Sequence, residues 1–209
     1  MTNRPIVPHN SRAPGEDSVE KFDPQSISLR AQKKLVGSLP KGIIKLFLDE
    51  SSARLFENIF SLIKQYTGCA KLSAYLTKQA IKLNVKALIL ISNNILSDEE
   101  LNHAYEFHEK CHQVAEITLR LGRPKRRLLP GVEPSIDKLI QMMKEANQTL
   151  VDAVKQHISQ PSQDKFKEFT DFFCQREFIV EVFTNKNKYS AHMEKIYDDL
   201  EDMMDRGLF

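Results

Sequence analysis

The stretch KLFLDESSARLFENIFSLIKQYT, residues 45–67, decides how the rest of this chain is interpreted. After Asp49, apolar residues recur at spacings of three and four, the periodicity of an amphipathic α-helix: Leu55, Phe56, Ile59, Phe60, Leu62, Ile63 and Tyr66. The side chains of Asp49, Ser51 and Ser52 can accept hydrogen bonds from the first N–H groups of such a helix. The pattern therefore predicts a core helix that begins near Asp49 and ends at Gly68.

Length and composition indicate one folded domain in a reducing compartment. The chain has 209 residues, 41% of them hydrophobic and 28% charged, which is enough to bury a core. A net charge of +2 argues against a nucleic-acid partner. The three widely spaced cysteines, Cys69, Cys111 and Cys174, favour free thiols. No apolar run approaches the roughly 20 residues of a membrane span. We therefore expect a cytoplasmic protein.

The N-terminal part divides into a tail and a basic helix. Residues 1–25 are polar and proline-rich, which predicts a flexible tail, whereas residues 26–209 form a single helical domain. In residues 26–39 the cations Arg30, Lys33 and Lys34 fall on one helical face, and Lys41 follows on the same side. Two interpretations stay open for this helix. It has an ordinary solvated charged face, the commoner case, or it lies at a membrane surface with its cations on anionic headgroups.

The rest of the domain reads as helices joined by short connections. Residues 71–92 form one helix, in which Lys78, Lys82 and Lys86 repeat every four residues; VKALILI, residues 85–91, continues it. Ser97-Asp98-Glu99-Glu100 is a capping box that opens the next helix. Further helices are predicted at residues 135–158, 166–173, 178–183 and 189–204. The fold class is therefore all-α, an antiparallel bundle of about six helices behind a basic amphipathic N-terminal helix.

Metal and enzyme motifs are weak. Glu100-x-x-His103 and Glu109-x-x-His112 have the spacing of di-iron bundles, but both lie on one helix and cannot close around one metal pair. His108, Cys111 and His112 lack a fourth zinc ligand at a recognisable spacing. No phosphate-binding glycine loop and no nucleophile elbow occurs. We predict no catalytic residue, no metal and no cofactor apart from a phospholipid ligand.

Four segments together resemble a known family. They are LFLDESS at residues 46–52, AQKKL at 31–35, HISQPSQDKFKEFTDFF at 157–173 and KIYDDLEDMMDRG at 195–207. From about Phe22 to the C-terminus the chain resembles the tumor necrosis factor alpha-induced protein 8 family, or TIPE proteins. The resemblance implies antiparallel helices around an elongated hydrophobic cavity that is open at one end. It also implies a cytosolic carrier or presenter of phosphoinositides.

The resemblance also implies a set of site residues. Lys33 and Lys34 match the family's basic pair, whereas two arginines near the family's cavity mouth fall at Ser92 and His108. The neighbouring lysines of residues 71–92 can compensate for this departure. Candidates for contact with lipid headgroups and the membrane are Arg30, Lys33, Lys34, Lys41, Lys78, Lys82, Lys86 and His108. Candidates for the cavity lining are Leu76, Leu83, Leu90, Phe107, Met143, Leu150, Phe169 and Phe173.

The resulting functional hypothesis is a phospholipid-binding and transfer protein. By resemblance it regulates apoptosis, immune and survival signalling, with phosphoinositides and signalling proteins as partners. It is expected in the cytoplasm, in peripheral contact with the plasma membrane. The alternative is a death-domain-like interaction adaptor that carries no lipid. The basic helix and the many large apolar residues, such as those of the Phe-rich stretch 166–183, favour the first hypothesis.

Overall fold

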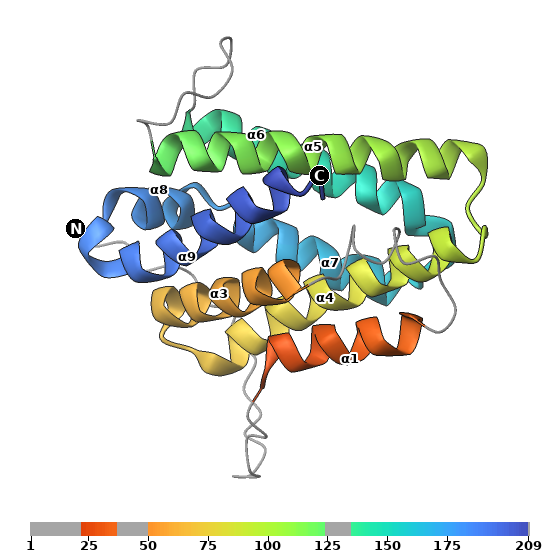
Figure 1. The fold of residues 1–209 in the computed structure, drawn as a ribbon, viewed down its shortest axis with the longest axis horizontal. Helices are drawn as coiled ribbons and strands as arrows, with labels where there is room; N and C mark the ends of the chain where they lie inside the picture. Colours follow the sequence, from red (N-terminus) through yellow and green to blue (C-terminus); the bar gives the residue numbers. More distant parts are fainter. Residues whose placement is uncertain (1–21, 37–49, 124–134, 209) are drawn as a thin grey trace.

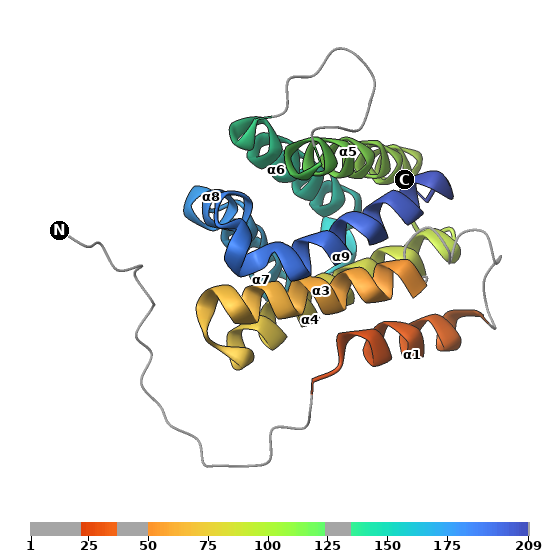
Figure 2. The same ribbon diagram turned by 60° about the vertical axis from the view of Figure 1, so that its left-hand side comes forward.

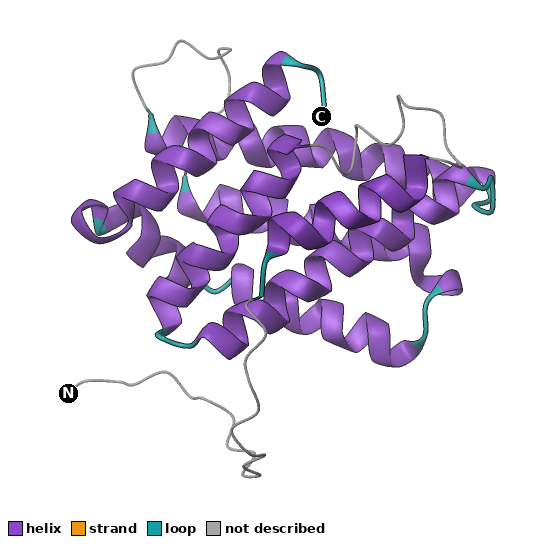
Figure 3. Cartoon of the chain, turned by 60° about the horizontal axis from the view of Figure 1, so that its bottom comes forward, coloured by secondary structure: helices purple, strands orange, loops and turns teal. Residues whose placement is uncertain are grey.

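The structure is helical throughout its described parts. The computed structural model describes residues 22–36, 50–123 and 135–208; the side chains of residues 31–36 and 186 lie outside this description. Within these ranges eight α-helices and one 3-10 turn occur, and none of the described residues is in a strand (Figure 3). The elements are α1 (Pro24–Val36), α3 (Glu50–Thr67), α4 (Ala70–Ser92), α5 (Asp98–Gly122), α6 (Ile136–Val154), η1 (Lys155–His157), α7 (Gln160–Phe173), α8 (Arg176–Thr184) and α9 (Lys186–Asp205).

The all-α prediction is confirmed, and VKALILI lies inside α4. The helix predicted at 135–158 ends as an α-helix at Val154 and continues as the 3-10 turn η1. The N-terminal helix begins at Pro24, two residues before its predicted start, and residues 37–39 of the prediction lie outside the described residues. Within the described residues, none of the helices combines the length and the apolar character that crossing a bilayer requires.

The helices stack in successive tiers (Figure 1). α5 and α6 pack against each other along one side, and α9 lies between α5 and α3. α4 contacts α3 on one side and α7 on the other. α1 lies along the outer side of α3 and α4 (Figure 2). The two ends of the described chain are therefore joined through α3, which contacts both α1 and α9.

Two hydrophobic clusters form the core. The larger core cluster joins α3, α5, α6, α8 and α9, and its fully buried members include Phe178 and Tyr189. The smaller core cluster joins α4, the start of α5, the end of α6 and α7. Its buried residues are Leu83, Ala87, Leu90, Ala104, Leu150, Ala153, Val154 and Phe166. Each large apolar side chain buried in this way contributes about 1.5–3 kcal/mol. α5 and α6 run in opposite directions through both clusters, which holds the two ends of the bundle together.

Local capping fixes several helix ends. The hydroxyl of Ser97 accepts a hydrogen bond from the N–H of Glu100 at 3.3 Å, and the carboxylate of Glu100 accepts one from the N–H of Ser97 at 2.9 Å, which confirms the capping box. Ser135 caps α6 by accepting from the N–H of Lys138. Gly68, with φ of +68°, follows the last residue of α3 in the left-handed region that glycine adopts without strain.

The structure corrects the prediction that the side chain of Ser51 caps the start of α3. This side chain is buried, and its hydroxyl donates a hydrogen bond to the carboxylate of Asp202 on α9. Arg206 donates to the same hydroxyl at 2.9 Å. The hydroxyl of Ser51 therefore joins two helices instead of capping the start of α3. Asp49, another of the three predicted capping residues, lies outside the described residues.

Candidate functional site

The lysines that repeat along α4 lead to a basic pocket. Lys78 and Lys82 are exposed and Lys86 is half-buried. Lys82 and Lys86 line a pocket of about 350 Å³ that lies between α4 and the start of α7. We call this the basic pocket. Its lining residues are Gln79, Lys82, Leu83, Lys86, His157, Ile158, Ser159, Ser162, Lys165 and Phe166.

The walls of the basic pocket are polar, and part of its lining is core. Three lysines come from two helices, and no Asp or Glu occurs among its described lining residues. Leu83 and Phe166 belong to the smaller core cluster, and Ile158 packs against that cluster. A pocket of this kind can hold a negative group at its cations while an apolar part of the same molecule contacts the core side chains.

Two contacts fix the basic pocket's walls. Next to it, the hydroxyl of Tyr75 on α4 donates to Oε2 of Glu168 on α7 at 2.7 Å. Burial and this hydrogen bond raise the pKa of Tyr75 to about 12, so the phenol stays protonated. At the other wall, Nε2 of His157 lies 3.1 Å from Oε1 of Glu100. The N–H of Ser97 and the imidazole of His157 hold the pKa of Glu100 below its usual value. The carboxylate of Glu100 therefore links the α5 cap to the turn before α7.

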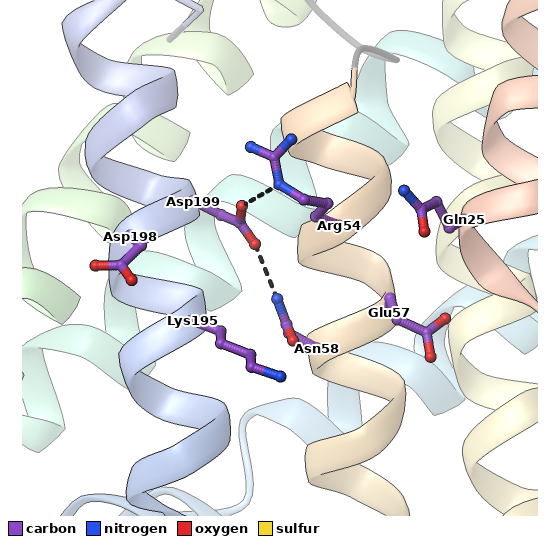
Figure 4. A pocket seen from close by; sticks show the side chains of 7 residues that line it. All are labelled: Gln25, Arg54, Glu57, Asn58, Lys195, Asp198 and Asp199. Carbon is purple, nitrogen blue, oxygen red and sulfur yellow. Dashed lines mark hydrogen bonds and ion pairs between the residues drawn. The ribbon is translucent and has the colours of Figure 1, made fainter.

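A second, larger pocket has different chemistry. It measures about 440 Å³ and lies between α1, α3 and α9, lined by Gln25, Arg54, Glu57, Asn58, Lys195, Asp198 and Asp199 (Figure 4). The buried Asp199 accepts from Nε of Arg54 at 2.8 Å and from Nδ2 of Asn58 at 2.9 Å. Asp198 pairs with Arg123. Both aspartates are thus paired with side chains of the protein itself.

Comparison with known proteins places the chain in a family. A family profile described as "Tumor necrosis factor alpha-induced protein 8-like" matches residues 22–207. The chain belongs to this family. Tumor necrosis factor alpha-induced protein 8 of Mus musculus is 24% identical over 195 residues, which cover 92% of this chain and 94% of the relative. The human protein of that name is 23% identical over 193 residues, covering 91% and 93%.

Another relative in this family carries a related name. Tumor necrosis factor alpha-induced protein 8-like protein 2 of Xenopus tropicalis is 26% identical over 190 residues, 90% of this chain and 99% of the relative. Two of the segments that carry the resemblance meet in the structure, since α3 begins at Glu50 within LFLDESS and packs against α9, which contains most of KIYDDLEDMMDRG.

The two positions where TIPE proteins are expected to carry arginine do not join the basic pocket. The hydroxyl of Ser92 donates to the carbonyl oxygen of Leu88 in its own helix. His108 is half-buried, and its Nε2 is buried without a hydrogen-bond partner among the described residues. The role of His108 in headgroup contact stays a prediction.

The predicted basic N-terminal helix lies against the bundle. The ring of Phe22 packs on Phe60 of α3 at 5.3 Å between centroids, and Ser28 is buried. Arg30 is exposed and donates to the hydroxyl of Ser26 one turn earlier. The side chains of Lys33 and Lys34, and the whole of Lys41, lie outside the described residues.

The predicted cavity-lining residues divide between the two core clusters. Leu83, Leu90, Phe107, Leu150 and Phe169 belong to the smaller core cluster or pack against it. Met143 and Phe173 pack against the larger one, and Leu76 is buried in α4. An elongated cavity that these residues share stays a prediction.

Sequence reasoning found one half of the basic pocket. Lys82 and Lys86 were identified by their spacing on one helix, but Lys165, His157, Ser159 and Ser162 were missed. These residues lie in the segment HISQPSQDKFKEF, which looked like an interhelical turn followed by a core helix. The only local sign of a binding site in this segment is a helix start followed, in the second turn of the helix, by Lys165. Across the described residues, no group of three or more His, Cys, Asp and Glu side chains is arranged to hold a metal ion.

Proposed function

We propose that this protein binds anionic phospholipids, phosphoinositides in particular, and thereby regulates apoptosis, survival and immune signalling. The observation that carries the proposal is the row Lys78, Lys82 and Lys86 on α4, of which Lys82 and Lys86 line a pocket that also has core side chains in its lining. Membership of the tumor necrosis factor alpha-induced protein 8-like family supports it. The protein would act in the cytoplasm, in peripheral contact with the inner leaflet of the plasma membrane.

The physical argument has two parts. Each lysine near an anionic membrane surface contributes about 1 kcal/mol of attraction, which salt screens. An acyl chain that is buried in an apolar site, instead of being exposed to water, is stabilised by about 0.8 kcal/mol per CH₂. The first part requires cations that are free to reach the surface, as the exposed Lys78 and Lys82 are. The second part requires the predicted cavity, and it is what would make the protein a carrier.

Sedimentation with vesicles tests the membrane contact. Phosphatidylcholine vesicles with and without a phosphoinositide are compared for the wild type and for the variant Lys78→Glu, Lys82→Glu, Lys86→Glu. The matched control is Lys64→Glu, Lys144→Glu, Lys195→Glu, which changes the same charge at three exposed lysines on α3, α6 and α9. We expect the α4 variant to lose most of its phosphoinositide-dependent binding and the control to keep it. Equal losses of vesicle binding in the two variants would mean that only the net charge of the protein matters, and not the position of the lysines on α4.

The carrier function has a separate test. Native mass spectrometry of the purified protein, and transfer of a fluorescent phospholipid between vesicles, report whether lipid leaves the membrane with the protein. A protein that binds vesicles but never carries lipid would be a membrane-recruited adaptor. A protein that does neither would support the alternative, a helical interaction module without lipid cargo.

A further inference from the structure

The basic pocket lies at the N-terminus of a helix. α7 has 14 residues, and Ser159 occupies its N-cap position without a side-chain hydrogen bond to the helix. The hydroxyl of Ser159 instead lies 3.1 Å from the hydroxyl of Ser162. Both serines line the basic pocket. The positive end of the α7 dipole and two hydroxyl groups that can donate hydrogen bonds are therefore placed beside the lysines.

The charge of the basic pocket is uncompensated. Lys82, Lys86 and Lys165 have no ion-pair partner among the described residues, although the structure pairs many other lysines and arginines, such as Lys110 with Glu145 and Lys167 with Asp171. Two nearby carboxylates are already engaged, Glu100 with His157 and Glu168 with Tyr75. Three unpaired cations that converge on one pocket from two helices favour a ligand with more than one negative charge.

We propose that the basic pocket binds a phosphomonoester, a terminal phosphate that carries about two negative charges near neutral pH. Lys82 and Lys86 contact it from α4, and Lys165 contacts it from α7. The hydroxyls of Ser159 and Ser162 donate to its oxygens, and charge-assisted bonds of this kind are about twice as strong as neutral ones. A phosphodiester, as in unphosphorylated phosphatidylinositol or phosphatidylserine, offers about one negative charge and one non-bridging oxygen fewer than a phosphomonoester, and binds more weakly.

The size and lining of the basic pocket indicate what carries the phosphate. A volume of about 350 Å³ admits a ring of sugar size with its phosphate, and Leu83, Ile158 and Phe166 offer apolar contacts for the ring's carbon atoms. The phosphate source is a lipid headgroup or a soluble phosphorylated polyol. Only the lipid source rests on the proposed function. In either case the phosphate is recognised at Lys82, Lys86 and Lys165, whereas the hydroxyl of Ser92 donates to the carbonyl oxygen of Leu88 and Nε2 of His108 is buried.

Calorimetry with two soluble headgroups tests the preference. Glycerophosphoinositol with one terminal phosphate on its ring is compared with glycerophosphoinositol, which has only the phosphodiester. We expect the first to bind at least tenfold more tightly. We also expect Lys82→Gln, Lys165→Gln to lower its affinity by roughly tenfold or more, since each substitution removes a cation that makes a charge-assisted hydrogen bond to the phosphate.

The matched control is Lys71→Gln, Lys167→Gln. It removes the same charge from the same two helices, at exposed lysines outside the pocket lining. We expect it to lower the affinity less than threefold. Amide NMR shifts should move at Gln160 and Ser162 when the phosphate binds, and circular dichroism should show that each variant is folded.

A second set of measurements, with vesicles, distinguishes a lipid headgroup from a soluble phosphorylated polyol as the source of the phosphate. Phosphatidylcholine vesicles that contain either phosphatidylinositol or a phosphorylated phosphatidylinositol are tested with the same proteins. Binding of the soluble phosphate that depends on Lys82 and Lys165, without vesicle binding, supports a soluble ligand and overturns the proposed function alone. Vesicle binding without any binding of the soluble phosphate overturns this inference and leaves the proposed function standing. Equal affinity for the two soluble headgroups, or equal losses in the two lysine variants, also overturns it.

Discussion

Nε of Arg54 donates to Oδ1 of Asp199 at 2.8 Å, which ties the start of α3 to the last helix of the chain. The Asp199 side chain is only 7% exposed, and its second oxygen accepts from Asn58. Arg54 is 43% exposed and also lies 3.7 Å from Oδ2 of Asp202. The pair therefore consists of a buried carboxylate and a half-exposed guanidinium (Figure 4), and its two partners should respond differently to truncation.

We expect Arg54→Ala to cost about 3 kcal/mol of unfolding free energy, because it leaves the buried carboxylate of Asp199 with one neutral donor. Asp199→Ala should cost less, about 1–2 kcal/mol, since water can solvate the freed guanidinium. Urea denaturation measures both. Asp171→Ala is the control, because its pair with Lys167 is exposed and such pairs contribute about 0–1 kcal/mol. The prediction is wrong if Arg54→Ala costs no more than the control.

Gly122 tests another contact of α9, the one with the end of α5. A Cβ at this position would lie 2.0 Å from Cζ of Tyr197, whose ring is buried and packs beneath the guanidinium of Arg123. Gly122→Ala must therefore displace a packed aromatic ring, and we expect a loss of about 1–3 kcal/mol, as for other overpacked sites. Thermal unfolding of the variant measures this loss.

A double-mutant cycle isolates the cause. Tyr197→Leu removes the atoms that the new methyl group meets, at the cost of a cavity. If the collision is responsible, Gly122→Ala should be much less harmful in the Tyr197→Leu background than in the wild type. Additive losses would mean that the cost of Gly122→Ala comes from elsewhere.

The link between Glu100 and His157 predicts a pH dependence. The pKa of Glu100 is lowered in the folded protein, first by the N–H of Ser97 and then by His157. A carboxyl group with a lowered folded-state pKa stabilises the protein above its unfolded-state pKa, and this stabilisation is lost as pH falls through the folded-state pKa. We expect the wild type to lose unfolding free energy progressively below about pH 5.

Glu100→Gln keeps a side chain that can complete a capping box but removes the titrating group. Its unfolding free energy should fall less steeply with decreasing pH than that of the wild type. Glu99→Gln is the control, an exposed neighbour in the same helical turn. Chemical denaturation at a series of pH values gives the slopes. Parallel curves for the wild type and Glu100→Gln would contradict the assignment.

Local features of this fold could be predicted from sequence, and contacts between distant segments could not. The capping box of Ser97 and Glu100 involves residues of one turn, so its spacing was sufficient. The helical period of α4 identified VKALILI correctly because the pattern before it continues without a break. Ser51 was misassigned because serine at a helix start is usually a cap, and the partner that wins here, Asp202, lies at the other end of the chain.

The basic pocket shows the same limit. Lys82 and Lys86 were identifiable from spacing, but the approach of Lys165 depends on how α7 packs against α4. His157 could not be paired with Glu100 because the hydrogen bond needs η1, a turn that helical periodicity had included in a longer helix. Of the cavity-lining candidates, Leu76, Leu83, Leu90 and Leu150 are buried, yet the pattern of apolar residues does not say whether the space between the candidates is filled.

The last prediction concerns the N-terminal helix. α1 packs on α3 and α4 while Arg30 stays exposed, so a basic face can meet a membrane without α1 leaving the bundle. Lys33 and Lys34 follow Arg30 at helical spacings of three and four and match the family's basic pair.

Lys33→Glu, Lys34→Glu changes the charge by about four units, enough to offset several kcal/mol of surface attraction. We expect sedimentation with phosphoinositide vesicles to fall, and higher salt to weaken the wild type similarly. Binding of the soluble phosphorylated headgroup in the basic pocket should stay within about threefold, because α1 contributes none of the lysines that line it. Lys144→Glu, Lys195→Glu supplies the charge-matched control. If the folded α1 variant sediments as well as the wild type at low salt, α1 has no membrane role, and contact through α4 alone, or the adaptor alternative, takes its place.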